Sequence, residues 1–152
     1  MNKKLFISLL IGMFFLNIQI CFGQKNKPKL FEVKKIYIER IDDKKYEKFY
    51  ESLTNELRRK LVFTVVSTIE EADSILKIDF LFEIIIHSEK GFFDPVFRCN
   101  LFSKSQDLIW KKDITIDTKG NTEADNHLAA QRIAEKLLKD WLKADRQKKK
   151  ST

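Results

Sequence analysis

The chain has 152 residues, of which 34% are charged, and its formal net charge is +7 at pH 7. This is the length of one ordinary domain, which can bury a hydrophobic core without covalent staples. With only four glycines and two cysteines, the composition argues against a glycine-rich phosphate loop and against a disulfide framework.

The first 23 residues have the form of a secretory signal. Two lysines precede an apolar run from Leu5 to Ile20, and small residues at Cys21 and Gly23 suit cleavage before Gln24. We therefore expect a periplasmic or secreted protein whose signal is cleaved near Gly23/Gln24. Two alternatives stay open: the apolar run is about long enough for an uncleaved membrane anchor, and Cys21 could be the lipidated residue of a bacterial lipoprotein.

Cleavage would leave Cys99 as the only cysteine, and its apolar strand predicts an ordinary buried thiol. Much of the remaining positive charge lies at the two ends of the chain. We expect residues 24–30 to be a flexible leader and residues 145–152 to be a basic disordered tail. Export argues against nucleic acid as a partner, whereas the lysine-rich ends suit a weak contact with anionic membrane.

Residues 31–144 are expected to form a single α+β domain that begins with a strand over residues 31–41. Ile36 and Ile38 share one face of that strand, and Tyr37 lies on the other. Asp42 and Asp43 then offer a turn and a helix N-cap. The next segment has apolar residues at helical intervals of three and four. They are Tyr46, Phe49, Tyr50, Leu53, Leu57 and Leu61.

Four further strands and a second helix follow. Short strand 63–66 and a turn at 67–73 lead to a long alternating strand over 76–86. A loop at 89–95, a strand at 96–102, a polar hairpin at 103–107 and a strand at 108–117 come next. The closing helix begins at a capping-box pattern, Thr122 with Asp125, and is expected to end near Ala144.

This order predicts an α+β fold with a single mixed, mainly antiparallel five-stranded sheet and two helices packed on one face. The element order is β-α-β-β-β-β-α. The first strand, helix and second strand should form a right-handed parallel crossover, and the last three strands a meander. Because each helix has one apolar stripe, both helices can cover the same sheet face. The other face, with charged residues on alternate positions, would then meet solvent or a partner.

Four residues are candidates for an interaction site. Phe92 and Phe93 occupy a predicted loop bounded by Gly91 and Pro95, where exposed aromatic rings would make strong interface anchors. Both rings could instead fold back over the end of the sheet. Tyr37 and Leu81 fall on the otherwise polar sheet face and form a second candidate patch.

Catalytic patterns are weak in this sequence. His87 and His127 lie forty residues apart, and neither has the neighbouring ligands that a metal site needs. Cys99 is expected in the core, which disfavours a nucleophilic role. The clusters at 42–43 and 70–73 could supply a carboxylate pair for hydrolysis, although turns and caps also explain them. We therefore predict no catalytic residue, no cofactor and no metal.

The arrangement resembles a recurrent domain of bacterial envelope proteins. The likeness spans residues 33 to 142 and rests on these segments: the helix at 46–61, Phe63–Val66, Glu70–Asp73, Gln106–Trp110 and the closing helix at Leu128–Leu142. The amino-terminal domain of TolB, the curli secretion lipoprotein CsgG and small lipoproteins that activate peptidoglycan synthases are similar in this order. The resemblance implies a non-enzymatic exported domain that binds other envelope proteins or assembles with itself.

The sequence thus favours a non-catalytic exported cell-envelope protein that acts through protein–protein contacts or assembly. Its partner would be another envelope protein or a second copy of the chain. An envelope hydrolase that uses a carboxylate pair, and a membrane-surface protein held by its basic tails, remain as alternatives. The specific partner and the oligomeric state lie beyond the sequence.

Overall fold

The computed structural model describes residues 29–85, 92–117 and 122–150. The predicted signal segment and most of the predicted leader therefore lie outside the described residues. The described elements are the 3-10 helices η1 (Leu30–Glu32) and η2 (Lys44–Tyr46), the α-helices α2 (Glu47–Arg59) and α3 (Thr122–Lys150), and the strands β1 (Lys35–Ile38), β2 (Thr64–Val66), β3 (Ser74–Ile85), β4 (Phe92–Ser103) and β5 (Leu108–Thr115).

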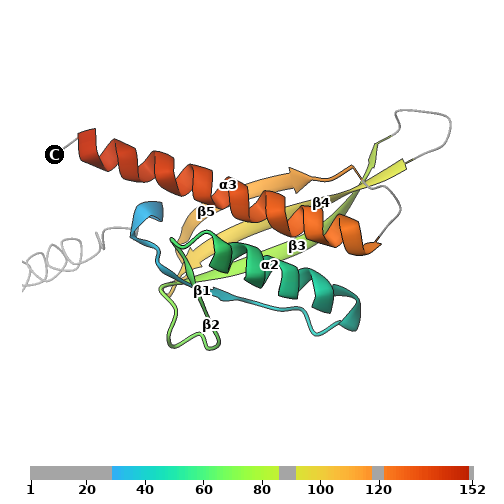
Figure 1. The fold of residues 1–152 in the computed structure, drawn as a ribbon, viewed down its shortest axis with the longest axis horizontal. Coiled ribbons are helices and arrows are strands. Elements are labelled where there is room, and N and C mark those ends of the chain that lie inside the picture. Colours follow the sequence, from blue (N-terminus) through green and yellow to red (C-terminus); the bar gives the residue numbers. More distant parts are fainter. Residues whose placement is uncertain (1–28, 86–91, 118–121, 151–152) are drawn as a thin grey trace, which may run out of the picture.

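The predicted α+β fold is confirmed. The strands form one five-stranded sheet in the order β2-β1-β3-β4-β5. β1 pairs in parallel with both β2 and β3, whereas β3, β4 and β5 pair antiparallel as the expected meander. α2 and α3 lie side by side on one face of this sheet, and α3 runs diagonally across it (Figure 1). The molecule therefore has two layers, one of helices and one of strands.

The core lies between these layers. Ile36, Leu76 and Leu101 from three neighbouring strands are fully buried, as are Leu53 from α2 and Leu137 from α3. At the end of the sheet near the start of α2, aromatic rings fill the space. These rings come from Tyr46, Phe49, Tyr50, Phe80 and Phe97, with centroids 3.9–6.3 Å apart. Burial of these side chains supplies the main stabilisation of the fold.

The start of α2 follows the sequence prediction, but its end does not. The Asp43 carboxylate accepts a hydrogen bond from Lys45 N at 3.0 Å and caps η2, which leads into α2. Leu61 was expected in the buried stripe, and this expectation is wrong. The helix ends at Arg59, and Leu61 takes a left-handed conformation with φ 55° and is 93% exposed. Its side chain is therefore turned away from the core by the helix termination.

Strand boundaries also differ from the sequence expectation. The strand expected over residues 31–41 is the shorter β1, from Lys35 to Ile38, and residues 30–32 form η1. β4 begins at Phe92, so Phe92 and Phe93 are strand residues rather than loop residues. Pro95 fits inside this strand because its backbone faces β5 where that ladder ends. Its carbonyl accepts from Ile116 N at 3.3 Å, just beyond the last β5 residue.

The closing helix is longer than expected. α3 continues to Lys150, so residues 145–150, which were predicted as a disordered tail, are helical. An ion pair between Lys149 and Asp145 at 3.0 Å spans one turn, and Lys148 Nζ lies 4.8 Å from the Phe31 ring centroid. Cations in the last turn also interact favourably with the helix dipole. These local interactions explain why the helix persists beyond the sheet.

Side-chain hydrogen bonds attach α3 to the rest of the fold. Trp141 Nε1 donates to the carbonyl of Val33 at 3.1 Å, and Trp110 Nε1 on β5 donates to Asp140 Oδ2 at 3.0 Å. Near the start of the helix, Arg132 Nη1 donates to the carbonyl of Thr115 at 3.0 Å. Partial burial acts to raise the pKa of Asp140, but the Trp110 hydrogen bond and the Lys136 charge together lower it. The helix layer is thereby fixed in position over the sheet.

Candidate functional site

The sheet face opposite the two helices carries an apolar row that crosses all five strands. Strand pairing aligns Tyr37 with Ile75, Ile75 with Phe102, and Phe102 with Leu108. Val66 on β2 extends the row beside Tyr37. Directly paired residues point to the same face. We call this set, Val66, Tyr37, Ile75, Phe102 and Leu108, the apolar row.

Exposure within the apolar row rises toward its outer end at β5. Ile75 at the centre is only 2% exposed, whereas Leu108 is 50% exposed. Val66, Tyr37 and Phe102 are half-buried. The row therefore offers partly exposed apolar side chains on a sheet face that the described helices do not cover (Figure 1). Grouped apolar surface of this kind is typical of contact sites.

A band of paired charges lies next to the apolar row on the same face. Lys77 Nζ is 2.7 Å from Glu39 Oε2. Arg98 makes two hydrogen bonds to Asp113, from Nε at 3.1 Å and from Nη2 at 3.0 Å. These hydrogen bonds are the main reason that the pKa of Asp113 lies below its ordinary value. The band is thus held by side-chain geometry as well as by charge.

The charged band contacts the apolar row. Lys77 Nζ lies 5.9 Å from the centroid of the Phe102 ring, within the range of a cation–π interaction. Asn100 Nδ2 donates to Asp79 Oδ2 at 3.3 Å and links β4 to β3 inside the band. The face therefore combines an apolar strip with adjacent, fixed polar groups. Protein contact surfaces use the same combination of an apolar centre and a polar rim.

The structure separates the two residues that the sequence had grouped as one patch. Tyr37 belongs to the apolar row, but Leu81 lies six residues along β3 from Ile75. That spacing corresponds to about 20 Å, at roughly 3.3 Å per strand residue. Leu81 pairs instead with Val96 on the far side of the charged band. Tyr37 and Leu81 therefore occupy opposite ends of the open face.

The backbone pairing of β4 with β3 gives the positions of Phe92 and Phe93. They pair with Ile85 and Ile84 at the far end of the β3–β4 hairpin. This places them beyond Leu81 and at the opposite end of the face from the apolar row. Their role as interaction residues stays a prediction.

Ile75, Phe102 and Leu108 were not identified as site residues from the sequence. The sequence did contain one signal. Ile75 and Phe102 are apolar, although strand alternation places them on the face opposite to the core-facing residues Leu76 and Leu101. Alternation within each strand does not show which residues are neighbours across strands. That depends on the strand register and on the bulge between Leu101 and Phe102. The row became visible once the pairing was known.

Cys99 and the acidic turn, which were considered for catalysis, have structural roles. Cys99 is fully buried in the core, as expected, and burial raises the pKa of its thiol to about 12. Asp73 accepts hydrogen bonds from the backbone amides of Lys34 and Lys35 at 3.1 and 2.8 Å, which ties the turn before β3 to β1. His127 is exposed on α3, and His87 lies outside the described residues. These positions explain the acidic turn without a catalytic role.

No three His, Cys, Asp or Glu side chains in the described part of the chain are grouped so that they could hold a metal ion. Among the same residues, no helix has the length and apolar character needed to span a bilayer. The apolar run at residues 5–20 lies outside the described residues.

Comparison with known proteins supports the fold. No protein-family model matches the sequence, and no curated protein is similar to it in sequence. A DUF330 protein from Xanthomonas campestris superposes with a TM-score of 0.51 at 12% identity, covering 84% of this chain and 93% of that one. At this identity the match shows a shared fold alone.

Two other solved structures are more distant. A minor lipoprotein from Acinetobacter baumannii has a TM-score of 0.49 at 11% identity, covering 71% of this chain and 94% of that one. A variant PelC dodecamer from Paraburkholderia phytofirmans has a TM-score of 0.49 at 12% identity, covering 74% and 92%. Neither match bears on function. The chain is thus a two-layer α+β protein that shares the fold of the DUF330 protein.

Proposed function

We propose that this chain is a non-catalytic exported protein of the bacterial cell envelope that acts through protein–protein contacts on its open sheet face. The observation that carries the proposal is the apolar row, which crosses five strands on the face opposite the helices. Export is the expectation from the N-terminal segment, whose apolar run at Leu5–Ile20 has the form of a signal.

The chemistry of the open face suits a protein partner. Aromatic side chains contribute strongly to contact surfaces because they bury a large area at low cost in side-chain entropy. Tyr37 and Phe102 supply such rings, and both are half-buried at their positions in the sheet. The ion pair between Arg98 and Asp113, in the charged band on the same face, is already formed, so little reordering is needed when a partner covers it.

The partner is either another envelope protein or a second copy of this chain. Both possibilities use the same face and the same contact residues. Light scattering on the purified protein separates them, because self-association raises the measured mass with concentration. That measurement reports on the protein alone and needs no knowledge of the partner.

Site-specific photo-crosslinking in the source cells tests the proposal. A photoreactive phenylalanine analogue at Leu108, on the exposed end of the apolar row, is compared with the same analogue at Asn55, exposed on α2. We expect a discrete crosslinked protein from position 108 and none from position 55. Equal crosslinking from both positions would contradict a contact specific to the open face.

A pair of double variants tests whether the row makes the contact. Phe102→Ser with Leu108→Ser makes the row polar, whereas Ile41→Ser with Leu61→Ser changes two exposed apolar residues outside it. We expect the first variant to abolish the crosslink from a probe at Tyr37 and the second to leave it unchanged. Retained crosslinking in a folded first variant would exclude the row as the contact surface.

A further inference from the structure

The solvent side of α3 carries cations at a regular helical interval. They follow one another at steps of four and three residues, which places them along one side of a helix. The set consists of Arg132, Lys136, Lys139, Lys143, Arg146 and Lys150. We call it the cationic stripe.

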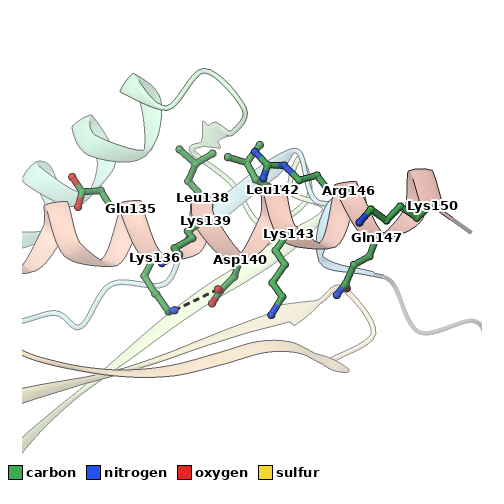
Figure 2. Close-up of a pocket in the computed structure, with 10 residues that line it drawn as sticks. All are labelled: Glu135, Lys136, Leu138, Lys139, Asp140, Leu142, Lys143, Arg146, Gln147 and Lys150. Atoms are coloured by element: carbon green, nitrogen blue, oxygen red, sulfur yellow. Dashed lines mark ion pairs between the residues drawn. The ribbon is translucent and has the colours of Figure 1, made fainter.

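Most of the cationic stripe lies on the solvent side of α3, whereas Arg132 reaches β5 and donates to the carbonyl of Thr115. Ile133, Leu137 and Trp141, on the opposite side of α3, are buried against the core. All described residues that line the surface hollow along the C-terminal half of α3 come from α3 itself (Figure 2). Figure 2 shows Lys136 and Lys143 on one flank and Arg146 on the other. At 1.5 Å per residue, the stripe runs for about 27 Å.

Strand β5 widens the stripe at its middle. Lys112 lines a hollow of about 360 Å³ between β5 and α3, together with Arg132, Lys136 and Lys139. Two acidic residues, Asp113 and Glu135, line the same hollow. Lys112 pairs with Cys99 and so belongs to the helix-covered side of the sheet, at its β5 edge. The cations of strand and helix therefore converge on one surface.

Local acidic residues do not balance this charge. Residues 132–150 contain eight Lys and Arg against three Asp and Glu. Lys136 pairs with Asp140 at 3.4 Å, and Lys149 pairs with Asp145 at 3.0 Å. Stabilisation by the helix dipole explains cations only in the last turn, so it does not account for Arg132 to Lys143. The excess along the helix gives this surface a positive potential that would attract an anionic partner.

We propose that the cationic stripe binds the anionic headgroups of a membrane surface. Two observations favour a lipid surface over a linear polyanion. Leu142, beside the stripe, is 38% exposed, and an apolar side chain among cations can enter the headgroup region. In addition, the half-buried Phe31 ring lies 4.8 Å from Lys148 Nζ, so a second partly exposed apolar side chain lies at the C-terminal end of the stripe.

This proposal does not depend on the open face. The stripe belongs to α3 in the helix layer, whereas the apolar row lies on the sheet face that the described helices do not cover. A membrane on the helix side would leave the open face directed away from the bilayer, accessible to a protein partner. The two contacts can therefore be tested separately.

Vesicle co-sedimentation tests the stripe, using the protein as the source cell processes it. Vesicles with phosphatidylglycerol are compared with pure phosphatidylcholine vesicles, at low and high salt. The variant Lys139→Gln, Lys143→Gln, Arg146→Gln is compared with Lys35→Gln, Lys44→Gln, Lys111→Gln, which loses the same charge at exposed positions elsewhere. Each cation at an anionic surface contributes roughly fivefold in affinity.

We expect salt-sensitive binding to the phosphatidylglycerol vesicles, weakened at least about tenfold in the stripe variant and less than about twofold in the control variant. Equal weakening in both variants would show an effect of net charge alone and would overturn the proposal. Absence of vesicle binding, with polyphosphate bound through the stripe, would also overturn it in favour of a linear polyanion. Circular dichroism of each variant verifies that α3 remains folded.

Discussion

The two faces of the sheet come from the same strands but have different physical roles. On the helix-covered face, Ile36, Leu76 and Leu101 are fully buried and pack against α2 and α3. On the open face, the residues next to them in sequence form the apolar row and the charged band. The covered face stabilises the fold, whereas the open face keeps side chains that a partner can reach.

The two faces differ in where the charged side chains lie. Charges are costly to bury, so they gather on the face that meets water. On the open face they are paired across strands, as Lys77 and Glu39 are at 2.7 Å. The apolar row differs from the charged band because its side chains are apolar and yet partly exposed, up to 50% at Leu108. This contrast is why the row carries the functional proposal.

Removal of an aromatic ring from the core should produce the largest loss of stability. Phe49 is fully buried, and its ring centroid lies 5.3 Å from that of Phe97. We expect Phe49→Ala to lower the free energy of unfolding by about 3–5 kcal/mol, through lost burial and the cavity that remains. Urea unfolding followed by circular dichroism measures the change.

The matched change on the open face is Leu108→Ala, at a position 50% exposed. We expect a loss below about 1 kcal/mol, because much of that side chain is already in water. Similar losses for the two variants would show that the open face is as tightly packed as the core. The distinction between the faces would then fail.

Thiol chemistry gives a second measure of the same contrast. Cys99 is fully buried and burial raises its pKa to about 12, so very little reactive thiolate exists near neutral pH. Its neighbour Asn100 points to the open face. In a Cys99→Ser background, Asn100→Cys should react with iodoacetamide at least about a hundredfold faster than native Cys99 does. Comparable rates would mean that the core opens on the time scale of the reaction.

Much of the fold was predictable from periodicity. The alternation through Leu76, Ile78 and Phe80 identified the longest strand and its buried face. The apolar spacing from Tyr46 to Leu57 identified α2. Boundaries were less accessible, because they depend on local interactions beyond hydrophobic pattern. Leu61 left the stripe through helix termination, and the ion pair of Lys149 with Asp145 extended α3.

The candidate site was only partly predictable. Tyr37 was recognised as an apolar residue on a polar face, but its neighbours Ile75 and Phe102 were not. A row across strands depends on which residues pair, and one sequence does not specify register. The cationic stripe is different, because its spacing is visible in sequence once residues 145–150 are known to be helical.

The apolar row itself should contribute moderately to stability. Phe102 is half-buried and lies beside Ile75, with Lys77 Nζ 5.9 Å from its ring centroid. We expect Phe102→Ala to lower the free energy of unfolding by about 1–2 kcal/mol, less than the loss at a fully buried ring. Phe102→Leu should recover most of that loss. A loss equal to that of Phe49→Ala would place Phe102 in the core and remove it from the contact surface.

The smallest effect is expected from the charged band and depends on pH. Arg98 holds the pKa of Asp113 below its ordinary value. The ionised Asp113 carboxylate therefore stabilises the fold at pH values above its unfolded-state pKa of about 3.9. This contribution is lost as the pH falls through the lower, folded-state pKa. Asp113→Asn should have a slightly lower urea midpoint than the native protein at pH 6. The difference should shrink as the pH falls through the folded-state pKa and the native carboxylate becomes protonated.

The pH dependence of the stability difference shows whether the charged band stabilises the fold. If the difference between Asp113→Asn and the native protein persists in acid, it arises from packing or neutral hydrogen bonds, and the band is an extension of the fold. If it vanishes and is small throughout, the pair is an exposed ion pair that adds little stability. Arg98 and Asp113 would then hold a fixed arrangement of charge beside the apolar row, at the position where a partner would meet it.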